Sequence, residues 1–154
     1  METIPSIQWF PGHMAKTRRL MTKSLKLVDV VVELRDARIP ASSANPEIKK
    51  LVGGKPRILL LNKSDAADPG KTKTWSEYYR NQGVPVLAVD CRSGKGLRAF
   101  PQTVEKTLED LLRRRRERGL VGRPVRIMIV GVPNVGKSSL INRLSGGRRT
   151  KVED

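Results

Sequence analysis

The sequence predicts an α/β fold, in which a mostly parallel open sheet is flanked by helices. Two observations support this fold class. Short apolar runs rich in Val, Ile and Leu alternate with longer amphipathic stretches, and polar segments with ligand-binding patterns come directly after two of these runs. Such runs are typical of strands that are buried on both faces of a parallel sheet. In sheets of this kind, ligands bind beyond the carboxyl ends of the strands.

Each expected element follows from a local pattern. We expect strands at 28–34, 57–61, 84–89 and 126–130, where the apolar runs lie. Helices are expected at 14–26, 46–51, 71–82, 97–118 and 137–144. Pro46 suits the first position of a helix, and Gly83 and the Gly146-Gly147 pair are typical of residues that end one.

The composition limits the classes of protein to consider. At 154 residues the chain can build one core, so we expect one domain or part of one. Its 31 Lys and Arg against 15 Asp and Glu leave a net charge of +16, which favours nucleic acid as a partner; a merely cationic surface is the alternative. The single cysteine excludes an internal disulfide, and no apolar run reaches the roughly 18 residues of a spanning helix. We therefore expect a cytoplasmic protein with no membrane partner.

Residues 131–139 read Gly-Val-Pro-Asn-Val-Gly-Lys-Ser-Ser and lie between an expected strand and an expected helix. This is the Walker A pattern, in which backbone N–H groups and a lysine cradle phosphates. Lys137 supplies the positive charge, and the Ser138 hydroxyl is the expected Mg²⁺ ligand. The predicted nucleotide-binding residues here are Asn134, Val135, Gly136, Lys137, Ser138 and Ser139. The alternative is a glycine-rich turn that only links the strand to the helix.

The tetrapeptide Asn62-Lys63-Ser64-Asp65 has the Asn-Lys-x-Asp pattern that reads guanine. It ends an apolar run, so we expect it at the same sheet edge as the Walker A loop. The Asp65 carboxylate can accept hydrogen bonds from guanine N1–H and the 2-amino group, and adenine offers neither donor there. Lys63 would lie along the base, and Asn62 would tie this loop to the phosphate loop. Alternatively, the tetrapeptide is a polar turn in which Asp65 caps the next helix.

The loop after the third apolar run is a further candidate. Its segment Ser93-Gly94-Lys95-Gly96 is placed to cover the guanine from the other side. Ser93 and Gly94 are therefore predicted nucleotide-binding residues. A plain turn is an equally good interpretation of this segment taken alone.

Four segments occur in an unusual order for guanine-nucleotide switches, because the Asn-Lys-x-Asp pattern precedes the Walker A loop. They are residues 9–14 (Trp-Phe-Pro-Gly-His-Met), 36–40 (Asp-Ala-Arg-Ile-Pro), 62–65 and 131–139. In this order the chain resembles circularly permuted ribosome-assembly GTPases of the ribosome biogenesis GTPase A type. The resemblance implies a circularly permuted Ras-like P-loop GTPase fold, in which residues 117–124 join the former termini. It also implies a basic N-terminal segment and helix at 1–27, packed on a GTPase domain at 28–154.

The resemblance implies a GTP-binding and GTP-hydrolysing assembly factor for the large ribosomal subunit. Its expected ligands are GTP or GDP and Mg²⁺, and its expected partners are the precursor of the large subunit and its rRNA. No mitochondrial-type transit peptide is visible, so we expect the bacterial cytoplasm as the location. We also expect a monomer. Proteins of this type resemble one another in lacking the glutamine that orients water in Ras-like switches. His13, in the Pro-Gly-His segment, is the suspected catalytic residue; alternatively, it packs against or caps the first helix.

The expected GTPase domain is incomplete at its C-terminal side. The chain contains no Asp-x-x-Gly segment, and it ends at Asp154, about where the resemblance places the first switch loop. Two strands of the family's sheet and its C-terminal helical region are therefore expected to be absent. We expect an uncovered apolar edge on the strand at 126–130, and hydrolysis by this chain alone is in doubt.

Basic residues gather in two of the expected helices. Lys16, Arg18, Arg19, Lys23 and Lys26 lie in the first helix and are candidates for contact with rRNA phosphates. Residues 113–116 are four consecutive arginines, which cannot share one helix face because successive residues step about 100° around the axis. We expect them to be mostly solvated and partly explained by the helix dipole.

Two other classes of protein stay open. One is a P-loop kinase or ATPase, which the carboxylate of Asp65 disfavours. The other is an RNA-binding module that keeps a P-loop without hydrolytic activity.

Overall fold

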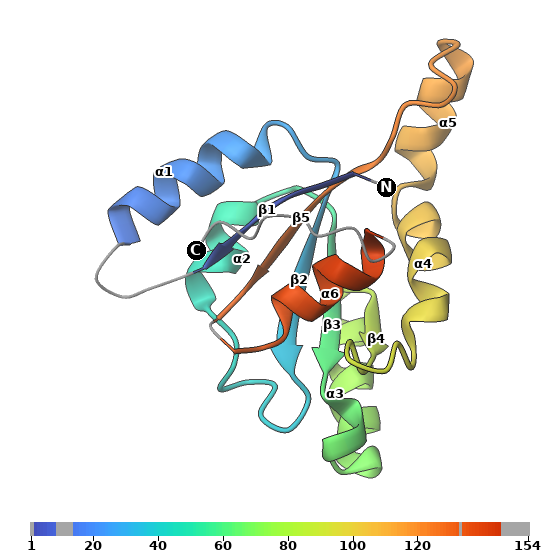
Figure 1. Ribbon diagram of the computed structural model, residues 1–154. Helices are drawn as coiled ribbons and strands as arrows, with labels where there is room; N and C mark the ends of the chain where they lie inside the picture. The colour runs from blue at the N-terminus through green and yellow to red at the C-terminus, as the bar shows by residue number, and fades with distance from the viewer. Residues whose placement is uncertain (1, 9–13, 133, 146–154) are drawn as a thin grey trace.

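The structure is a computed structural model, and it describes residues 2–8, 14–132 and 134–145. Its centre is a five-stranded sheet in the order β1-β5-β2-β3-β4, and each described pairing in it is parallel (Figure 1). The strands are β1 (Glu2–Gln8), β2 (Val30–Asp36), β3 (Arg57–Asn62), β4 (Val86–Ala88) and β5 (Arg126–Gly131). This parallel α/β architecture confirms the predicted fold class.

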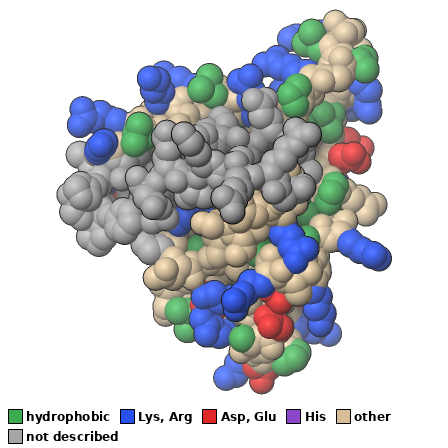
Figure 2. Space-filling model, viewed as in Figure 1, with side chains coloured by type: hydrophobic (Ala, Val, Ile, Leu, Met, Phe, Trp, Pro, Cys, Tyr) green, Lys and Arg blue, Asp and Glu red, His purple; other side chains and the backbone are tan. Residues whose placement is uncertain are grey.

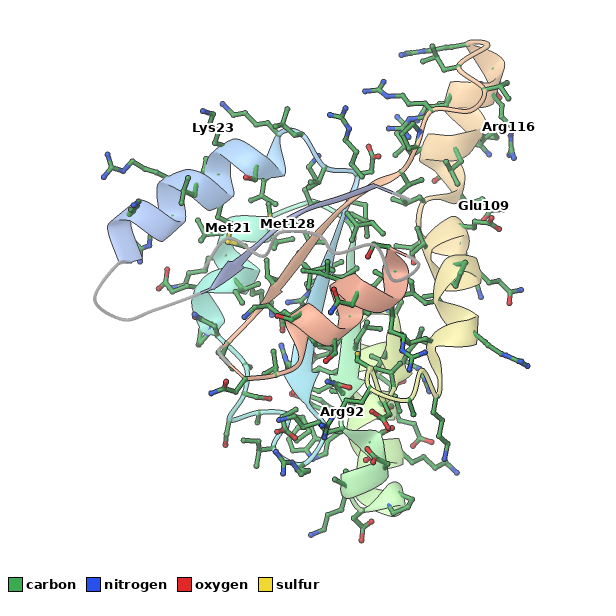
Figure 3. All side chains as sticks on the ribbon, viewed as in Figure 1. Met21, Lys23, Arg92, Glu109, Arg116 and Met128 are labelled. Atoms are coloured by element: carbon green, nitrogen blue, oxygen red, sulfur yellow. The ribbon has the colours of Figure 1, made fainter. Side chains whose placement is uncertain are left out.

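Helices cover both faces of the sheet. They are α1 (Met14–Leu25), α2 (Pro46–Val52), α3 (Pro69–Asn81), α4 (Phe100–Thr107), α5 (Glu109–Glu117) and α6 (Lys137–Leu144). Along β2, Val32 belongs to the core cluster under α4 and α6, and its neighbour Val31 belongs to the cluster under α1 and α2. Successive strand side chains point to opposite faces, so β2 is buried on both, as its apolar run predicts. Figure 3 shows Met21 of α1 beside Met128 of β5 in the second cluster.

Two helices begin at side-chain caps. The Asn45 side chain accepts a hydrogen bond from the Glu47 N–H at 3.0 Å, which starts α2 at Pro46 as predicted. The Asp68 carboxylate accepts one from the Lys71 N–H at 3.0 Å. Helix α3 therefore starts at Pro69 rather than at residue 71, because Asp68 is its N-cap.

The N-terminal strand corrects one prediction. β1 pairs with β5, with Glu2 opposite Arg126 and Gln8 opposite Gly131, so the edge of β5 that we expected to be uncovered is covered. Parallel partners lie far apart in sequence, and residues 2–8 include Pro5, which has no N–H to donate to a ladder. No local pattern therefore marks this strand. The register shifts between Ile4 and Ile7, the interval that contains the proline.

The prediction of a single helix at 97–118 is wrong. The segment forms a short 3-10 turn at Leu97–Ala99, followed by α4 and α5. Leu108 separates the two helices with a ψ of 18°, but its N–H still bonds to the Val104 carbonyl at 2.9 Å, so the helix bends there. Leu108 is buried in the core, and this tertiary packing accompanies the bend. β4 is also shorter than the strand predicted at 84–89.

Within the described ranges, none of the helices combines the length and the apolar character that crossing a bilayer requires.

Gly96 fixes the end of the loop that follows β4. It has a φ of +83°, and a Cβ on it would lie 2.3 Å from the Ala88 carbonyl oxygen. Gly83 has a similar φ of +81°, but no described atom lies within 4 Å of such a Cβ.

We predict that Gly96→Ala lowers the free energy of unfolding by roughly 3 kcal/mol, because backbone strain and the clash add, whereas Gly83→Ala lowers it by roughly 1 kcal/mol. Urea unfolding measures both values, and equal losses would contradict the role of the Ala88 contact.

Candidate nucleotide-binding site

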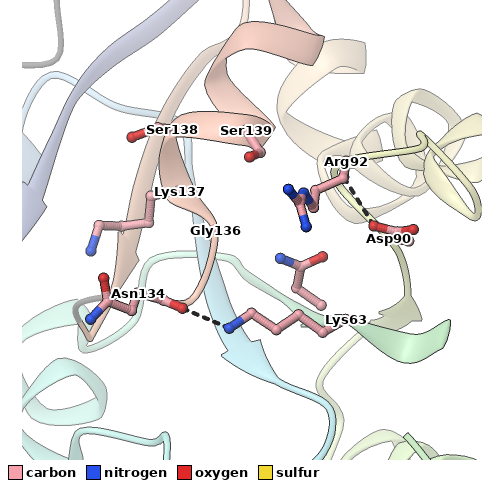
Figure 4. A pocket seen from close by; sticks show the side chains of 9 residues that line it. Lys63, Asp90, Arg92, Asn134, Gly136, Lys137, Ser138 and Ser139 are labelled. Carbon is pink, nitrogen blue, oxygen red and sulfur yellow. Dashed lines mark hydrogen bonds between the residues drawn. The ribbon is translucent and has the colours of Figure 1, made fainter. Parts of the chain in front are cut away.

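A cavity of about 380 Å³ lies beyond the carboxyl ends of β3 and β5 (Figure 4). The predicted site residues that line it are Asn62, Lys63, Asn134, Gly136, Lys137, Ser138 and Ser139. Asp90 and Arg92 line it as well, and neither was predicted. The two motifs therefore meet at one hollow, where the sheet-edge argument places them.

The Asn62 side chain ties three loops together. Its Nδ2 donates to the Val135 carbonyl at 2.7 Å, and its Oδ1 accepts from the Cys91 N–H at 2.9 Å. Asn62 is only 3% exposed, so water does not compete for these bonds. The expected link between the loop at 62–65 and the phosphate loop is present, and the same amide also holds the loop after β4.

The phosphate loop requires glycine where it passes Asn62. Gly136 has a φ of +102°, and a Cβ on it would lie 2.2 Å from the Asn62 Nδ2 atom. Asn134 also has a positive φ, of 66°. Left-handed residues of this kind help to turn successive N–H groups toward one point, as in the anion-binding nests of phosphate loops.

Lys137 is held inside its own loop. Its Nζ donates to the carbonyls of Gly131 at 3.0 Å and Val132 at 3.2 Å. Burial lowers the pKa of Lys137 to about 8, because the neutral carbonyls do not fully replace water around the charge. An anion in the cavity would favour the protonated form, so a bound phosphate would keep Lys137 charged.

Lys63 links the base loop to the segment at 36–40. Its Nζ donates to the Asn134 carbonyl at 2.9 Å and lies 3.5 Å from Oδ2 of Asp36. Asp36 also accepts two side-chain hydrogen bonds from Arg38, at 3.0 and 2.7 Å. These bonds, helped by the charge of Lys63, lower the pKa of the Asp36 carboxyl to about 2. The anionic carboxylate therefore stays available to orient Lys63 at neutral pH.

The loop at 90–96 is held by hydrogen bonds within the loop and by Arg143. The Asp90 carboxylate accepts hydrogen bonds from the Arg92 N–H at 3.0 Å and the Ser93 hydroxyl at 2.8 Å, and the Ser93 bond lowers the pKa of Asp90. Arg143 of α6 donates to the Arg92 carbonyl. The Arg143 guanidinium also lies against Gly94, where a Cβ would sit 3.2 Å from Nη1. The loop is thus fixed to the helix that starts at the phosphate loop.

Some predicted residues do not line the described cavity. They are Ser64, Asp65, Ser93, Gly94 and Val135. Val135 is buried and contributes its carbonyl to Asn62. Asp65 is exposed in the short turn Ser64–Ala66, directly after Lys63. Asp68 caps α3, so the alternative in which Asp65 caps that helix is wrong.

Of the two cavity residues that were not predicted, Asp90 and Arg92, only Asp90 lies in a recognisable local sequence pattern. Asp90 has a serine three positions later, a spacing typical of side-chain-stabilised turns, and the structure contains that bond. Arg92 has no such pattern. Its presence in the cavity follows from the fold of the loop, which Asn62 and Arg143 hold in place.

The residues of the cavity fit a magnesium ion that arrives with a nucleotide. Ser138 is exposed at the start of α6 and lines the cavity. Its hydroxyl is the type of ligand that Mg²⁺ accepts beside phosphate oxygens and water. The described part of the chain contains no group of three His, Cys, Asp or Glu that could form an all-protein metal site.

The predicted RNA-contact residues lie on the outside of α1 or directly after it. Lys16, Arg18, Arg19 and Lys23 of α1 and Lys26 after it are exposed, and Figure 2 shows Lys and Arg side chains over this helix. Met21 and Leu25 turn the other side of the helix into the core. Arg18 forms an ion pair with Glu47 of α2 at 2.7 Å. His13 lies outside the described residues.

Known proteins with similar sequences include GTPases. A family model described as 50S ribosome-binding GTPase matches residues 126–154. Ribosome biogenesis GTPase A of Priestia megaterium is 51% identical over 150 residues, covering 97% of this chain and 52% of that protein. The protein of the same name from Bacillus pumilus is 49% identical over 149 residues, covering 97% and 53%. Among solved structures, GNP-bound YlqF from T. maritima is similar with a TM-score of 0.61 and 35% identity, over 88% of this chain and 50% of that one.

The chain spans about half the length of the relatives it matches. The match nevertheless covers nearly all of this chain, including both nucleotide motifs. The resemblance drawn from the motifs is confirmed: this chain is similar over nearly its whole length to ribosome biogenesis GTPase A proteins, and its parallel α/β fold is similar to that of GNP-bound YlqF.

Proposed function

We propose that this chain is the nucleotide-binding part of a GTP-hydrolysing assembly factor for the large ribosomal subunit. Its relatives are named ribosome biogenesis GTPases, and a similar solved structure is bound to GNP. The observation that carries the proposal is the buried Asn62 amide, which holds the base loop, the phosphate loop and the loop after β4 at fixed spacing. A site that binds the base and the phosphates of one nucleotide at the same time requires its loops to be held at a fixed spacing before binding.

The site residues have separate roles in this proposal. The backbone around Gly136 and the ammonium group of Lys137 bind the phosphates, and Ser138 holds Mg²⁺. Bound Mg²⁺ would neutralise part of the phosphate charge. The base extends from the cavity along the stem of Lys63 and presents its edge to Asp65, which stands exposed in the following turn. Ser93 and Gly94 cover the base from the opposite loop.

The partners in this proposal are rRNA-rich precursors of the large subunit, and the factor acts as a monomer in the bacterial cytoplasm. The net charge of +16 supports rRNA as the partner, because contacts between cations and RNA phosphates release counterions. The exposed cations of α1 are the first contact surface, since they lie on the side of the helix that faces away from the core.

Asp65→Asn tests the proposed base recognition. The amide cannot accept hydrogen bonds from both guanine N1–H and the 2-amino group, so we predict that GDP affinity falls by roughly 100-fold. Affinity for xanthosine diphosphate should rise, because xanthine carries a carbonyl oxygen where guanine carries the amino group. Titration calorimetry with GDP, ADP and xanthosine diphosphate measures these changes.

Asp68→Asn is the matched control, since it makes the same chemical change three positions further along. Asn is as good an N-cap as Asp, so α3 and GDP affinity should be unaffected. An unchanged base preference in Asp65→Asn, or equal binding of ATP and GTP by the unmodified protein, would favour the kinase or ATPase class instead. RNA binding that is unchanged when nucleotide is removed would favour the non-hydrolytic module.

Arg143 offers a second test, because it positions the loop at 90–96 without lining the cavity. We predict that Arg143→Ala weakens GDP binding by about tenfold and speeds GDP release, the expected effect of losing one charge-assisted hydrogen bond. Arg80→Ala is the control: Arg80 donates to the Val86 carbonyl at 2.9 Å, a similar bond beside β4 but outside the cavity lining. Stopped-flow release of fluorescent GDP compares the two variants. Identical release rates would remove Arg143 from the site.

His13 is the proposed group that assists hydrolysis. We predict that His13→Ala leaves GDP affinity unchanged and lowers ribosome-stimulated GTP turnover by about 100-fold, a typical contribution of one proton-transferring side chain. Phosphate release in the presence of large ribosomal subunits is the measurement. Turnover equal to that of the unmodified protein would exclude His13 from the mechanism.

A further inference from the structure

We propose that the end of α5 is a second RNA-binding surface, separate from the nucleotide cavity and from α1. Figure 1 shows α5 and the connector after it extending beyond the sheet. The surface, called here the basic tip, consists of exposed arginines and two exposed apolar residues. They are Arg113, Arg114, Arg116, Arg118, Arg123, Leu120 and Val121. Figure 3 shows Arg116 near the end of α5, well apart from Arg92 of the cavity.

One internal ion pair orients the basic tip. The Arg115 guanidinium donates to the Asp29 carboxylate at 2.6 Å, and both side chains are mostly buried. The other oxygen of Asp29 accepts from the Arg126 N–H at 2.9 Å, so the pair joins α5 to the starts of β2 and β5. With Arg115 turned inward, its neighbours Arg114 and Arg116 point outward. The four consecutive arginines are therefore divided into one structural residue and three exposed ones, as their helical spacing requires.

The tip has a defined backbone. Gly119, at φ +71°, donates to the Arg116 carbonyl at 3.0 Å, and Leu120 donates to the Arg115 carbonyl at 2.9 Å. These two bonds form a Schellman motif, in which the residue after the glycine usually packs on an apolar residue of the last helical turns. Here the corresponding helical positions are Arg114 and Arg115, and Leu120 is 46% exposed. Val121 next to it is 81% exposed. The apolar pair is thus held at the surface among guanidinium groups.

Stabilisation of the C-terminal end of α5 does not account for the number of exposed arginines in the basic tip. A helix C-terminus carries roughly half a unit of negative charge, which one arginine offsets. Arg113 pairs with Asp110 at 3.2 Å, but both side chains are largely exposed, and such pairs contribute little. Glu117 is the one acidic residue among the five exposed arginines, so their mutual repulsion is only partly offset in the free protein. A polyanionic partner would relieve that repulsion.

The residue types favour RNA as that partner. Between residues 109 and 126 the chain has arginine at seven positions and no lysine. Arginine binds phosphate with two parallel hydrogen bonds and stacks its planar group on bases, which lysine does not do. RNA exposes unstacked bases at bulges and loops, where aromatic and planar groups can pack against them. Leu120 and Val121 give the tip an apolar end that fits against such a base, so we infer a bulged or looped RNA helix as the ligand class.

Three variants test the basic tip. The first replaces Arg113, Arg114, Arg116 and Arg118 by Gln, and the second replaces the same four residues by Lys. The third is the control, in which the exposed residues Lys49, Lys50, Lys71 and Lys73 become Gln. The control removes as much charge as the first variant, so it separates a local contact from the general attraction of a cationic protein. Fluorescence anisotropy with a labelled bulged RNA hairpin, repeated over a salt series, measures affinity and salt dependence.

We expect the Arg-to-Gln variant to bind at least about tenfold more weakly and to lose roughly 3 from the slope of log affinity against log salt. The Arg-to-Lys variant should keep most of that slope but bind more weakly, because the planar contacts are lost. Equal losses in the Arg-to-Gln variant and the control would overturn the proposal. Binding of the tip to anionic lipid vesicles, with no effect of these variants on RNA, would overturn it as well.

A fourth variant addresses the apolar end. Leu120→Ser with Val121→Ser should weaken binding of the bulged hairpin more than binding of a fully paired hairpin, and should leave the salt slope unchanged. An equal effect on both hairpins would overturn the assignment of this pair to an exposed base. The inference rests on the proposed function only for its RNA-rich partner. GDP affinity of the unmodified protein and of every variant is measured in parallel. Absence of GDP binding by the unmodified protein would contradict the proposed function, whereas only the RNA-binding results can contradict the proposal for the basic tip.

Discussion

The buried amide of Asn62 sets the spacing on which the rest of the site depends. It bonds to the phosphate loop with its nitrogen and to the loop after β4 with its oxygen. The sheet makes this possible, because β3 and β5 flank β2 and end at the same edge. Gly136 is the matching constraint, since any side chain at that position would displace the amide. A base site and a phosphate site from distant parts of the chain thus become one rigid unit.

Three acidic residues are engaged in ion pairs inside the structure. Glu33 is buried between Arg35 at 2.5 Å and Arg57 at 3.3 Å, and Asp29 and Asp36 are similarly engaged. Buried carboxylates require such partners, because leaving them unpaired costs several kcal/mol. The charges of these three carboxylates are therefore offset by neighbouring arginines. Exposed cations lie along α1 and near the end of α5, the two surfaces proposed above to contact RNA.

Local sequence patterns identified the sheet core and most of the cavity because both depend on short segments. A buried strand followed by a glycine-containing loop places its own residues at the sheet edge, whatever the remaining topology, and this correctly located Lys63 and Ser138. The same reasoning missed β1, whose pairing with β5 depends on residues more than a hundred positions away. It also missed the bend at Leu108 and the entry of Arg92 into the cavity. Each of these depends on packing against distant elements.

By itself, the sequence determined the α/β class, the motif order, the Walker A and Asn-Lys-x-Asp segments and the surplus of positive charge. These are local or additive properties, so no contact between distant residues is needed to establish them. Only the tertiary structure decided that Asn62 joins three loops, that Arg143 holds the loop at 90–96, and that Arg115 turns inward while its neighbours form an exposed tip. Those outcomes depend on which distant segments become neighbours, and that is decided when the hydrophobic faces of the sheet and helices pack together.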